Sequence, residues 1–354
     1  MDAEVHVSLL PQDTRPDSVR QAAAVVRQPC GIVGVVAIGR NEGERLQRCL
    51  SSMADNLGQL VYVDSGSSDG SVAMSRALGV TAIELDMSRP FTAARARNEG
   101  FEALLEAQPR IDYVFFVDGD CEVAGGWLQE AAEFLDTRRD VAVVWGCRRE
   151  RFPEKSVYNL LCDIEWQDLP VGETSICGGD AVIRVDAFRG VAGYRSDLIC
   201  GEEPELCVRL RQAGWRIWRL NRDMTRHDAA LYRFGQWWKR SLRSGYAYAQ
   251  GAALHGAPPE RHWVAESRRA WNWGLYIPLG ALLLSVALGW PALLLLLIYP
   301  LQMVRLARTG RHSARENWLR AGALVISKFP EMLGQLKFLR DRLRRAQSRI
   351  IEYK

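Results

Sequence analysis

The sequence lacks the cysteine patterns of metal-binding and disulfide-bonded proteins. Its eight cysteines form no Cys-x-x-Cys pair and no spacing to histidine that is typical of a zinc site. We therefore expect reduced, mostly buried thiols. Residues 1–29 contain three prolines and lack the apolar core of a secretory signal, which predicts a polar tail and a catalytic part in the cytoplasm. No internal repeat or low-complexity tract is present.

Acidic residues are scarce near the end of the sequence. Residues 305–354 hold 13 Lys or Arg against 4 Asp or Glu, a net charge of +9, whereas the whole chain carries +4. Such an asymmetry indicates an anionic partner. Because a hydrophobic segment directly precedes the basic stretch, we expect a phospholipid surface and no nucleic acid. The composition, 48% hydrophobic and 25% charged over 354 residues, is that of a globular chain longer than one typical domain.

The first two thirds of the chain alternate apolar runs with helical stretches. This alternation predicts an α/β fold with a Rossmann-like, mostly parallel sheet, whose ligands bind beyond the carboxyl ends of the strands. The expected strands cover residues 32–38, 60–63, 80–85, 113–117 and 141–145, and the expected helices cover residues 43–56, 71–78, 92–107 and 127–136.

Polar and acidic residues follow four of these strands. In Asp118-Gly119-Asp120, two carboxylates follow an apolar strand, where they suit Mg²⁺ or Mn²⁺ held together with substrate phosphates. Asp-Gly-Asp is also an ordinary turn, and Asp69 is equally placed to cap a helix. A site is favoured because all these groups share one edge of one sheet. The groups after the other strands are Arg40, Asn41 and Glu42, then Asp64 to Ser71, then Asp86, Ser88 and Arg89.

An ordered set of short motifs resembles the family 2 glycosyltransferases, whose catalytic domain has the GT-A fold. Each motif is loose, but the ordered set is specific, and it covers residues 31–251. The motifs are Arg40-Asn41-Glu42, Asp64-x4-Asp69-Gly70, Arg97-Asn98-x-Gly100, Asp118-x-Asp120, Gly178-Gly179-Asp180 and Gly201-Glu202-Glu203-x-x-Leu206-x-x-Arg209-x-x-x-x-Gly214.

The resemblance implies a site for a UDP- or GDP-linked sugar donor. It also implies Mn²⁺ or Mg²⁺ bound by Asp120 with Asp118, and it makes His227 a further candidate ligand, for which a structural role is the alternative. Arg97 is expected at the ribose or diphosphate because a guanidinium suits phosphate oxygens; a solvated helix face is the alternative. The nucleotide-binding residues implied by the resemblance are Arg40, Asn41, Glu42, Asp64, Asp69, Arg97, Asn98 and Asp118.

The resemblance also implies an acceptor side. Glu203 stands where relatives carry Asp, and it is expected to deprotonate the acceptor hydroxyl, with Glu202 or Glu205 as alternatives. Acidic residues at a helix N-terminus are also explained without a catalytic role. Direct displacement predicts inversion at the anomeric carbon. The expected contacts of donor or acceptor sugar are Gly178, Gly179, Asp180, Trp237 and Trp238.

These sugar contacts also have structural alternatives. The glycines are equally suited to a tight hairpin turn, and the tryptophans to packing at a membrane interface. Processive relatives carry a Gln-x-x-Arg-Trp motif, but the residues after Gln236 do not follow that order. We therefore do not expect continuous polymerisation.

The uncharged run at residues 275–304 predicts a membrane hairpin. One straight helix of this length exceeds the roughly 30 Å hydrocarbon core, and Gly289-Trp290-Pro291 divides the run into halves. Basic residues on both sides predict that both ends are cytoplasmic, with the hairpin spanning or re-entrant. A buried soluble hairpin is the alternative. Beyond it, an apolar stripe from Val325 to Leu343 predicts a basic amphipathic helix on the membrane or on the hairpin; a dimer helix is the alternative.

These features predict a chain of five parts. They are a polar tail (residues 1–29), a catalytic domain (30–252), a linker (253–270), a membrane hairpin (271–306) and basic amphipathic helices (307–354).

The function expected from the resemblance is that of an inverting, metal-dependent glycosyltransferase in polysaccharide biosynthesis. It would act at the cytoplasmic membrane face on a lipid-linked or growing surface-glycan acceptor. A nucleotidyltransferase is one alternative, although no Gly-rich phosphate loop follows the first strand. A non-catalytic nucleotide-sugar-binding scaffold is the other, because Glu203 replaces the expected Asp.

Overall fold

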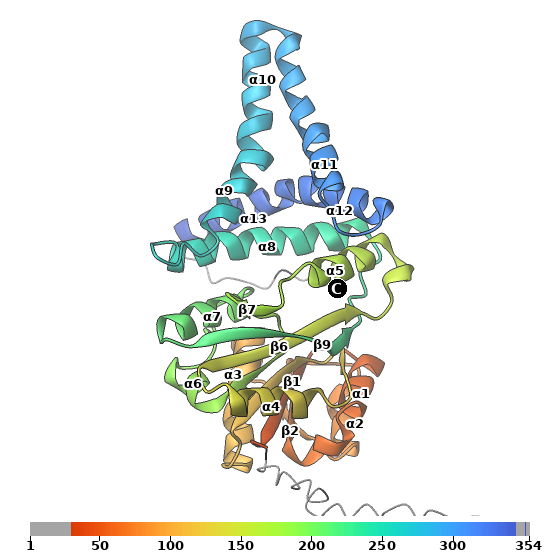
Figure 1. Cartoon of the computed structure of the whole chain (residues 1–354), viewed down its shortest axis with the longest axis vertical. Helices are drawn as coiled ribbons and strands as arrows, with labels where there is room; N and C mark the ends of the chain where they lie inside the picture. Colours follow the sequence, from red (N-terminus) through yellow and green to blue (C-terminus); the bar gives the residue numbers. More distant parts are fainter. Residues whose placement is uncertain (1–29, 345–350, 352–354) are drawn as a thin grey trace, which may run out of the picture. The chain divides into compact units, whose positions relative to one another are not determined.

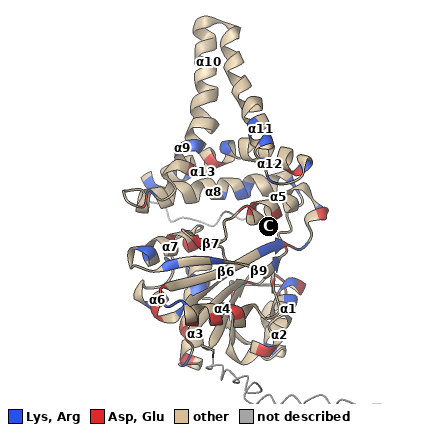
Figure 2. Cartoon of the chain, in the orientation of Figure 1, with Lys and Arg blue, Asp and Glu red and all other residues tan. Residues whose placement is uncertain are grey.

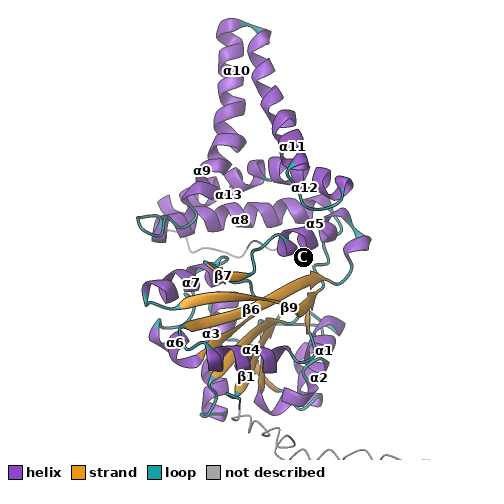
Figure 3. Cartoon of the chain, viewed as in Figure 1, coloured by secondary structure: helices purple, strands orange, loops and turns teal. Residues whose placement is uncertain are grey.

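A single mixed sheet forms the centre of the catalytic part. The computed structural model describes residues 30–344 and 351, so the predicted tail at residues 1–29 lies outside the described residues. Within the described ranges the sheet has nine strands in the order β3-β2-β1-β4-β8-β6-β9-β5, with β7 paired to β9, and helices flank it (Figures 1 and 3).

The first half of the sheet is parallel, as predicted. Neighbouring strands here pair in parallel, and β1, β2 and β4 are almost wholly buried. Their carboxyl ends therefore meet at one edge, where the polar residues follow. The strands are β1 (Val33–Gly39), β2 (Leu60–Asp64), β3 (Thr81–Glu84) and β4 (Tyr113–Asp118).

The second half departs from the mostly parallel prediction. Strand β8 (Ala181–Arg184) runs antiparallel between β4 and β6 (Val141–Glu150). Strand β9 (Arg216–His227) pairs in parallel with β6 and is 12 residues long. Two short strands, β5 (Cys121–Val123) and β7 (Gly172–Thr174), pair antiparallel with it. The length of β9 carries His227 to the edge where β4 ends.

The predicted connecting helices are present. They are α1 (Glu44–Ser51), α2 (Ser71–Ala77), α3 (Ala93–Ala107) and α4 (Trp127–Thr137), with a 3₁₀ turn at Ala54–Gln59 after α1. Thr92 caps α3, where its hydroxyl accepts from the Arg95 amide at 3.0 Å. Gly100 lets α3 lie close to the sheet, because a Cβ there would stand 2.5 Å from a methyl of Val36.

The remaining helices of the catalytic part are α5 (Val157–Gln167), α6 (Val185–Gly190), α7 (Glu202–Gln212) and α8 (Phe234–His255), with a 3₁₀ turn at Pro153–Lys155 before α5. All eight cysteines are free thiols, and all except Cys30 are buried, as the sequence predicted.

Helix α8 joins the catalytic part to a second helical layer. It packs against α13 (Lys328–Leu343) and α9 (Val264–Trp271), with α12 (Ala314–Ile326) alongside (Figure 1). The contact of α8 with α13 is close enough that only glycine fits: a Cβ on Gly245 would lie 1.9 Å from the Glu331 carbonyl oxygen.

Two apolar helices stand on this layer as a hairpin. The first runs from α9 through a π-helical turn (Asn272–Tyr276) into α10 (Ile277–Leu288), and the second joins a 3₁₀ segment (Trp290–Leu297) to α11 (Ile298–Arg308). Gly289 separates them with φ 79°, at the predicted break. Both are long and apolar enough to cross a membrane, and little of either is buried. Figure 2 shows no charged residues along the hairpin above its base.

The predicted single stripe after the hairpin is divided between two helices. Val325 and Met332 are buried, whereas Leu336, Leu339 and Leu343 are exposed. Helix α13 instead turns Glu331, Gln335 and Asp341 inward, where Glu331 pairs with Lys328 and Gln335 bonds to Ser267. The stripe therefore has a buried part and an exposed part, and its predicted contact with a membrane stays a prediction.

Candidate active site

A pocket of about 570 Å³ lies beyond the carboxyl ends of β1 and β4. It gathers nine of the residues predicted from the sequence: Arg40, Asn41, Glu42, Arg97, Asp118, Asp120, Glu202, Glu203 and His227. The other predicted residues do not line it: Asp64, Asp69, Asn98, Gly178, Gly179, Asp180, Trp237 and Trp238.

The two aspartates flank a tight turn from β4 into β5. The Gly119 amide donates to the Ile38 carbonyl at 2.8 Å, and a Cβ on Gly119 would lie 3.1 Å from that same oxygen. Gly119 therefore permits close packing on the end of β1. Asp120 is 7% exposed and points toward the end of β9.

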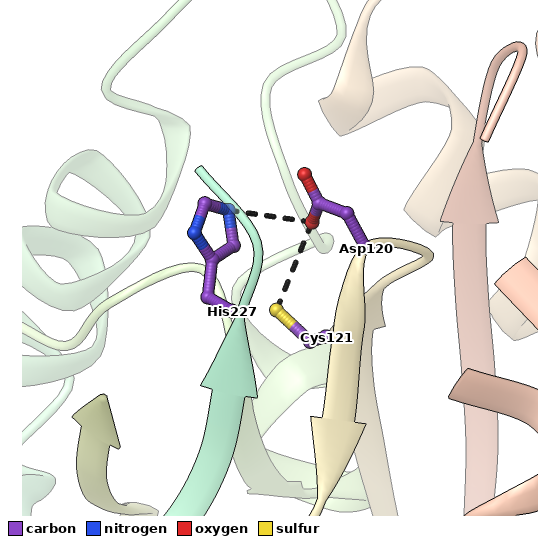
Figure 4. Close-up of side chains that lie close together, drawn as sticks. All are labelled: Asp120, Cys121 and His227. Atoms are coloured by element: carbon purple, nitrogen blue, oxygen red, sulfur yellow. Dashed lines mark hydrogen bonds and ion pairs between the residues drawn. The ribbon is translucent and has the colours of Figure 1, made fainter. Parts of the chain in front are cut away.

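Asp120, Cys121 and His227 come together through strand pairing (Figure 4). Cys121 lies opposite His227 in the β5–β9 register. His227 Nε2 lies 3.3 Å from Asp120 Oδ1, and the Cys121 thiol lies 3.8 Å from that oxygen. One ligand atom from each residue falls within 4.8 Å of the others. A carboxylate oxygen beside an imidazole nitrogen is a donor set that suits a divalent cation.

Arg97 forms the charged centre of the site. Its side chain is only 2% exposed, and Nη2 donates to Asp118 Oδ1 at 2.9 Å while Nη1 lies 2.8 Å from Glu202 and 2.9 Å from Glu203. Burial raises the pKa of Asp118, but Arg97 and Arg148 outweigh burial and hold it below its ordinary value. The guanidinium thus links Asp118 to the two glutamates, and its predicted contact with the nucleotide stays a prediction.

Asp180 is fully buried beneath the turn. It accepts from Arg148 Nε at 3.0 Å, from the Thr225 hydroxyl at 2.7 Å and from the Asp118 amide at 3.2 Å. Its oxygens are therefore occupied by the chain itself, and it positions Asp118 and Arg148. The sequence had predicted a sugar contact here.

Glu202 and Glu203 open α7 after Gly201, whose φ is 77°. Glu203 is the more accessible of the two, with 15% of its side chain exposed against 4% for Glu202. Burial and the neighbouring Glu202 raise the pKa of Glu203 to about 7, although Arg97 opposes this shift. Glu205, the third candidate, lies outside the pocket wall and pairs with Arg209.

Hydrogen bonds join the loop after β1 to the loop after β2. Asn41 has φ 55° and accepts from the Ser68 amide at 2.8 Å. Asp64 accepts from the Tyr62 hydroxyl and from two loop amides, and Asp69 accepts from the amide and the hydroxyl of Ser71, the first residue of α2. Asp64 and Asp69 therefore shape the loop that the pocket uses.

Arg40 follows the last residue of β1 and lines the pocket. Its guanidinium lies 4.7 Å from the ring centre of Phe91, and both residues line the wall. The arrangement offers a flat cationic and aromatic surface of the kind on which a planar base stacks.

Asn98 and Gly179 contact residues of the site but do not line the pocket. The Asn98 amide donates to the Tyr194 carbonyl at 2.7 Å and accepts from the Tyr194 amide at 2.9 Å. Gly179 fits between charged groups, because a Cβ there would lie 3.1 Å from Asp118 and 3.3 Å from Glu203.

The two tryptophans of α8 contact aromatic side chains of α5 and of α8 itself and do not line the pocket. Trp237 is buried and stacks on Tyr158 of α5 with ring centres 6.4 Å apart. Trp238 packs beside Phe234, 5.5 Å between ring centres.

The sequence reasoning missed several pocket residues, among them Arg148, Trp166, Arg240 and Arg243. Arg148 belongs to an extension of β6 beyond the predicted strand. The two α8 arginines, three residues apart, share a helix face, and this spacing was the only signal that pointed to them.

Part of the sequence matches a known family, and the fold is similar to that of a solved structure. Residues 35–191 match the family model for glycosyl transferase family 2. A mannosyltransferase from Pyrobaculum calidifontis, solved in complex with GDP-Man and Mn²⁺, is 18% identical with a TM-score of 0.55, over 89% of this chain and 92% of that one. TarS 1–349 from S. aureus is 13% identical with a TM-score of 0.48, over 83% and 90%.

One curated relative matches a short stretch of the sequence. A TPR repeat-containing protein of Synechococcus elongatus is 32% identical over 91 residues, which are 26% of this chain and 21% of that protein. The chain thus spans about a fifth of that relative. From the family match, residues 35–191 form a glycosyl transferase family 2 domain, and the mixed α/β fold of the chain is similar to that of the solved mannosyltransferase.

Proposed function

We propose that this family 2 glycosyltransferase is an inverting, divalent-metal-dependent enzyme. It would move a sugar from a UDP- or GDP-linked donor to a lipid-linked or growing-glycan acceptor at the cytoplasmic membrane face. The observation that carries the proposal is the meeting of Asp120 and His227 with Asp118 and Glu203 in one pocket, joined through Arg97.

The donor set fits Mn²⁺ or Mg²⁺. Asp120 and His227 would hold the cation, and Asp118 stands beside them at the end of β4. Asp180 is a poorer ligand because Arg148 and Thr225 already occupy it. When bound, such a cation neutralises the charge that develops on a departing nucleoside diphosphate. The solved mannosyltransferase of similar fold carries Mn²⁺ and GDP-Man, which supports this choice.

Glu203 would act as the base. Its raised pKa places it near the pH at which a carboxylate best accepts a proton from a hydroxyl. The acceptor oxygen then forms a bond to the anomeric carbon as the diphosphate leaves from the opposite face, which inverts that carbon. Arg40, Asn41 and Glu42 would contact the nucleotide, because they line the pocket at the end of β1.

Membrane attachment is proposed for the hairpin. Its two helices are long and apolar enough to cross a membrane. Many of its leucines are exposed, for example Leu283 by 61% and Leu297 by 53%. Basic residues at both ends favour a cytoplasmic base. Arg268 and Arg269 lie at one end, and Arg305 and Arg308 at the other.

Asp120→Ala is the direct test. Nucleoside diphosphate release from UDP- and GDP-sugars is measured with the full chain and Mn²⁺. We expect the rate of release to fall on the order of 100-fold or more, because no cation would neutralise the negative charge that develops on the departing diphosphate. Asp223→Asn, at a carboxylate that is 67% exposed on the same strand as His227, should leave release unchanged.

Two results would count against the proposal. Unchanged metal-dependent release in Asp120→Ala would remove the metal assignment. Tight nucleotide binding by the wild-type chain with no release for any donor would favour the scaffold alternative.

A further inference from the structure

Trp263 adopts a backbone conformation that a bulky residue rarely takes. It has φ 55° and ψ 15°, in the left-handed region, and Arg261, two residues before it, has φ 47°. Such a conformation costs free energy and persists only where surrounding contacts hold it, which is often the case near functional sites. Trp263 does not line the pocket, so its contacts must show what the strained segment supports.

The indole of Trp263 fits between two glycines that belong to different helices. A Cβ on Gly201, the residue before α7, would lie 2.6 Å from Cη2 of the ring. A Cβ on Gly251 of α8 would lie 2.5 Å from Cε3. Because neither position has room for a methyl group, the ring is in direct contact with both backbones. The indole therefore holds the start of α7 against α8.

Other aromatic side chains fix the ring in this place. The His262 ring stacks on it with ring centres 4.3 Å apart, and Tyr248 meets it edge-on at 5.4 Å. Burial lowers the pKa of His262 to about 4, so this imidazole is uncharged at neutral pH. The indole also packs against the buried cluster between α8 and α13, which includes Tyr246 and Phe338. Trp263 is thus anchored in the helical layer below the hairpin.

The start of α7 carries the proposed base. Gly201 has φ 77° and directly precedes Glu202 and Glu203, so its backbone sets where both carboxylates lie. Glu203 lies 2.9 Å from Arg97, and the charged groups that act on it are Arg97, Glu202 and Asp118. A glycine leaves the backbone free to rotate. A contact from outside α7 is therefore needed to hold Glu203 in one place.

Trp263 also belongs to the base of the apolar hairpin. It directly precedes α9, and α9 continues through the π-helical turn into α10 as one helical stretch, Val264–Leu288. The indole thus connects the helix that leads into the hairpin with the helix that carries Glu203.

We propose that Trp263 is a positioning residue for catalysis, whose indole holds the backbone at Gly201 so that Glu203 faces the acceptor. This inference rests on the proposed function, because it names the side chain that sets the place of the base. Trp263 touches no reacting atom and acts through Gly201.

Trp263→Ala is the test, with release of nucleoside diphosphate from UDP- and GDP-sugars measured for the full chain in a neutral detergent with Mn²⁺ and water as the acceptor. We expect kcat to fall about tenfold or more, because the base is no longer held, while the KM for the donor stays within about twofold. Trp263→Phe keeps an aromatic ring and should recover part of the loss. Trp271→Ala removes an indole of α9 that stacks on Tyr276, and it should leave both constants unchanged.

The pH profile separates positioning from a merely structural role. Burial is the main cause that raises the pKa of Glu203 to about 7, so a carboxylate that becomes exposed in Trp263→Ala should titrate nearer its ordinary value. The pH at which kcat/KM reaches half of its plateau should then fall by about one pH unit or more. A loss of stability alone lowers the plateau and leaves this midpoint unchanged.

Gly251→Ala tests the contact from the side of α8. Its methyl group would displace the ring, so kcat should fall about threefold or more and the midpoint should move in the same direction. In Trp263→Ala the ring is gone, so adding Gly251→Ala should cost nothing further. Nucleotide affinity and melting temperature, measured in the same samples, show that each variant is folded. If Trp263→Ala does not fold, Gly251→Ala supplies the same comparison.

The outcomes separate this inference from the proposed function. If the wild type releases nucleoside diphosphate and the folded variants keep its kcat, or lose kcat with an unchanged midpoint, the positioning role is overturned and the proposed function stands. An equal loss in Trp271→Ala would also overturn it. If the wild type releases nothing from any donor, the proposed function fails, and the inference fails with it.

Discussion

Arg97 is the residue on which the electrostatics of the site depend. A guanidinium that is 2% exposed and contacts Asp118, Glu202 and Glu203 neutralises carboxylates that would otherwise repel one another in a buried setting. The sequence marks Arg97 as functional, but its burial and its three partners depend on α3, β4 and α7 meeting.

Arg97→Met should destabilise the fold, because it leaves buried carboxylates without their partner. We expect the free energy of unfolding to fall by about 3–5 kcal/mol in chemical denaturation. The matched control is Arg76→Met, whose partner Glu84 is 60% exposed and whose loss should cost about 1 kcal/mol or less. Equal stability of the two variants would show that Arg97 does not hold the site together.

Glu203 gives the reaction a pH dependence with a defined sign. A base acts as the carboxylate, so protonation below its pKa of about 7 removes activity, and kcat/KM should rise with pH up to about 7 and then level off. Glu203→Gln should lose about 10²–10⁴-fold in kcat while still binding nucleotide. A profile without this rise, or an active Glu203→Gln, would remove Glu203 as the base.

At the scale of elements, the α8–α13 contact joins the catalytic part to the hairpin layer. Gly245 and Gly334 bring the two helix backbones together with no room for a methyl group. Neither glycine belongs to a motif recognised in the sequence, because a close helix contact leaves no local pattern.

Gly245→Ala should therefore lower the melting temperature measured in detergent. Overpacking costs about 1–3 kcal/mol and outweighs the gain in helix propensity. Gly280→Ala is the control, because a Cβ at this position of α10 meets no atom within 4 Å; it should be neutral or stabilising by up to about 1 kcal/mol. If the two variants melt alike, the contact is looser than described.

Elements also show where prediction from sequence succeeded. The strands β1, β2, β3, β4 and β6 and the helices between them follow from apolar runs, helical periodicity and turn residues, which are local signals. The antiparallel insertion of β8 and the full length of β9 were not predicted, because strand pairing joins residues far apart in sequence.

At the scale of the whole molecule, the hairpin exposes a large apolar surface, which is unfavourable in water. Leu283→Glu and Leu297→Glu should each reduce co-flotation of the full chain with lipid vesicles about tenfold or more, because a charge in hydrocarbon costs about 3 kcal/mol. Leu254→Glu, at an α8 position that is 37% exposed and off the hairpin, should float like the wild type. Undiminished flotation of both hairpin variants would contradict membrane insertion.

The sequence by itself determined strands β1, β2, β3, β4 and β6 with their connecting helices, the Asp118-Gly119-Asp120 turn after β4 and the break of the hairpin at Gly289, because each depends on neighbouring residues. Tertiary structure alone placed His227 beside Asp120 through the β5–β9 register. It also buried Arg97 among three carboxylates and brought the α8 arginines over the pocket. The physical reason is that these contacts join distant segments, so only folding the whole sheet and its helices decides which side chains meet.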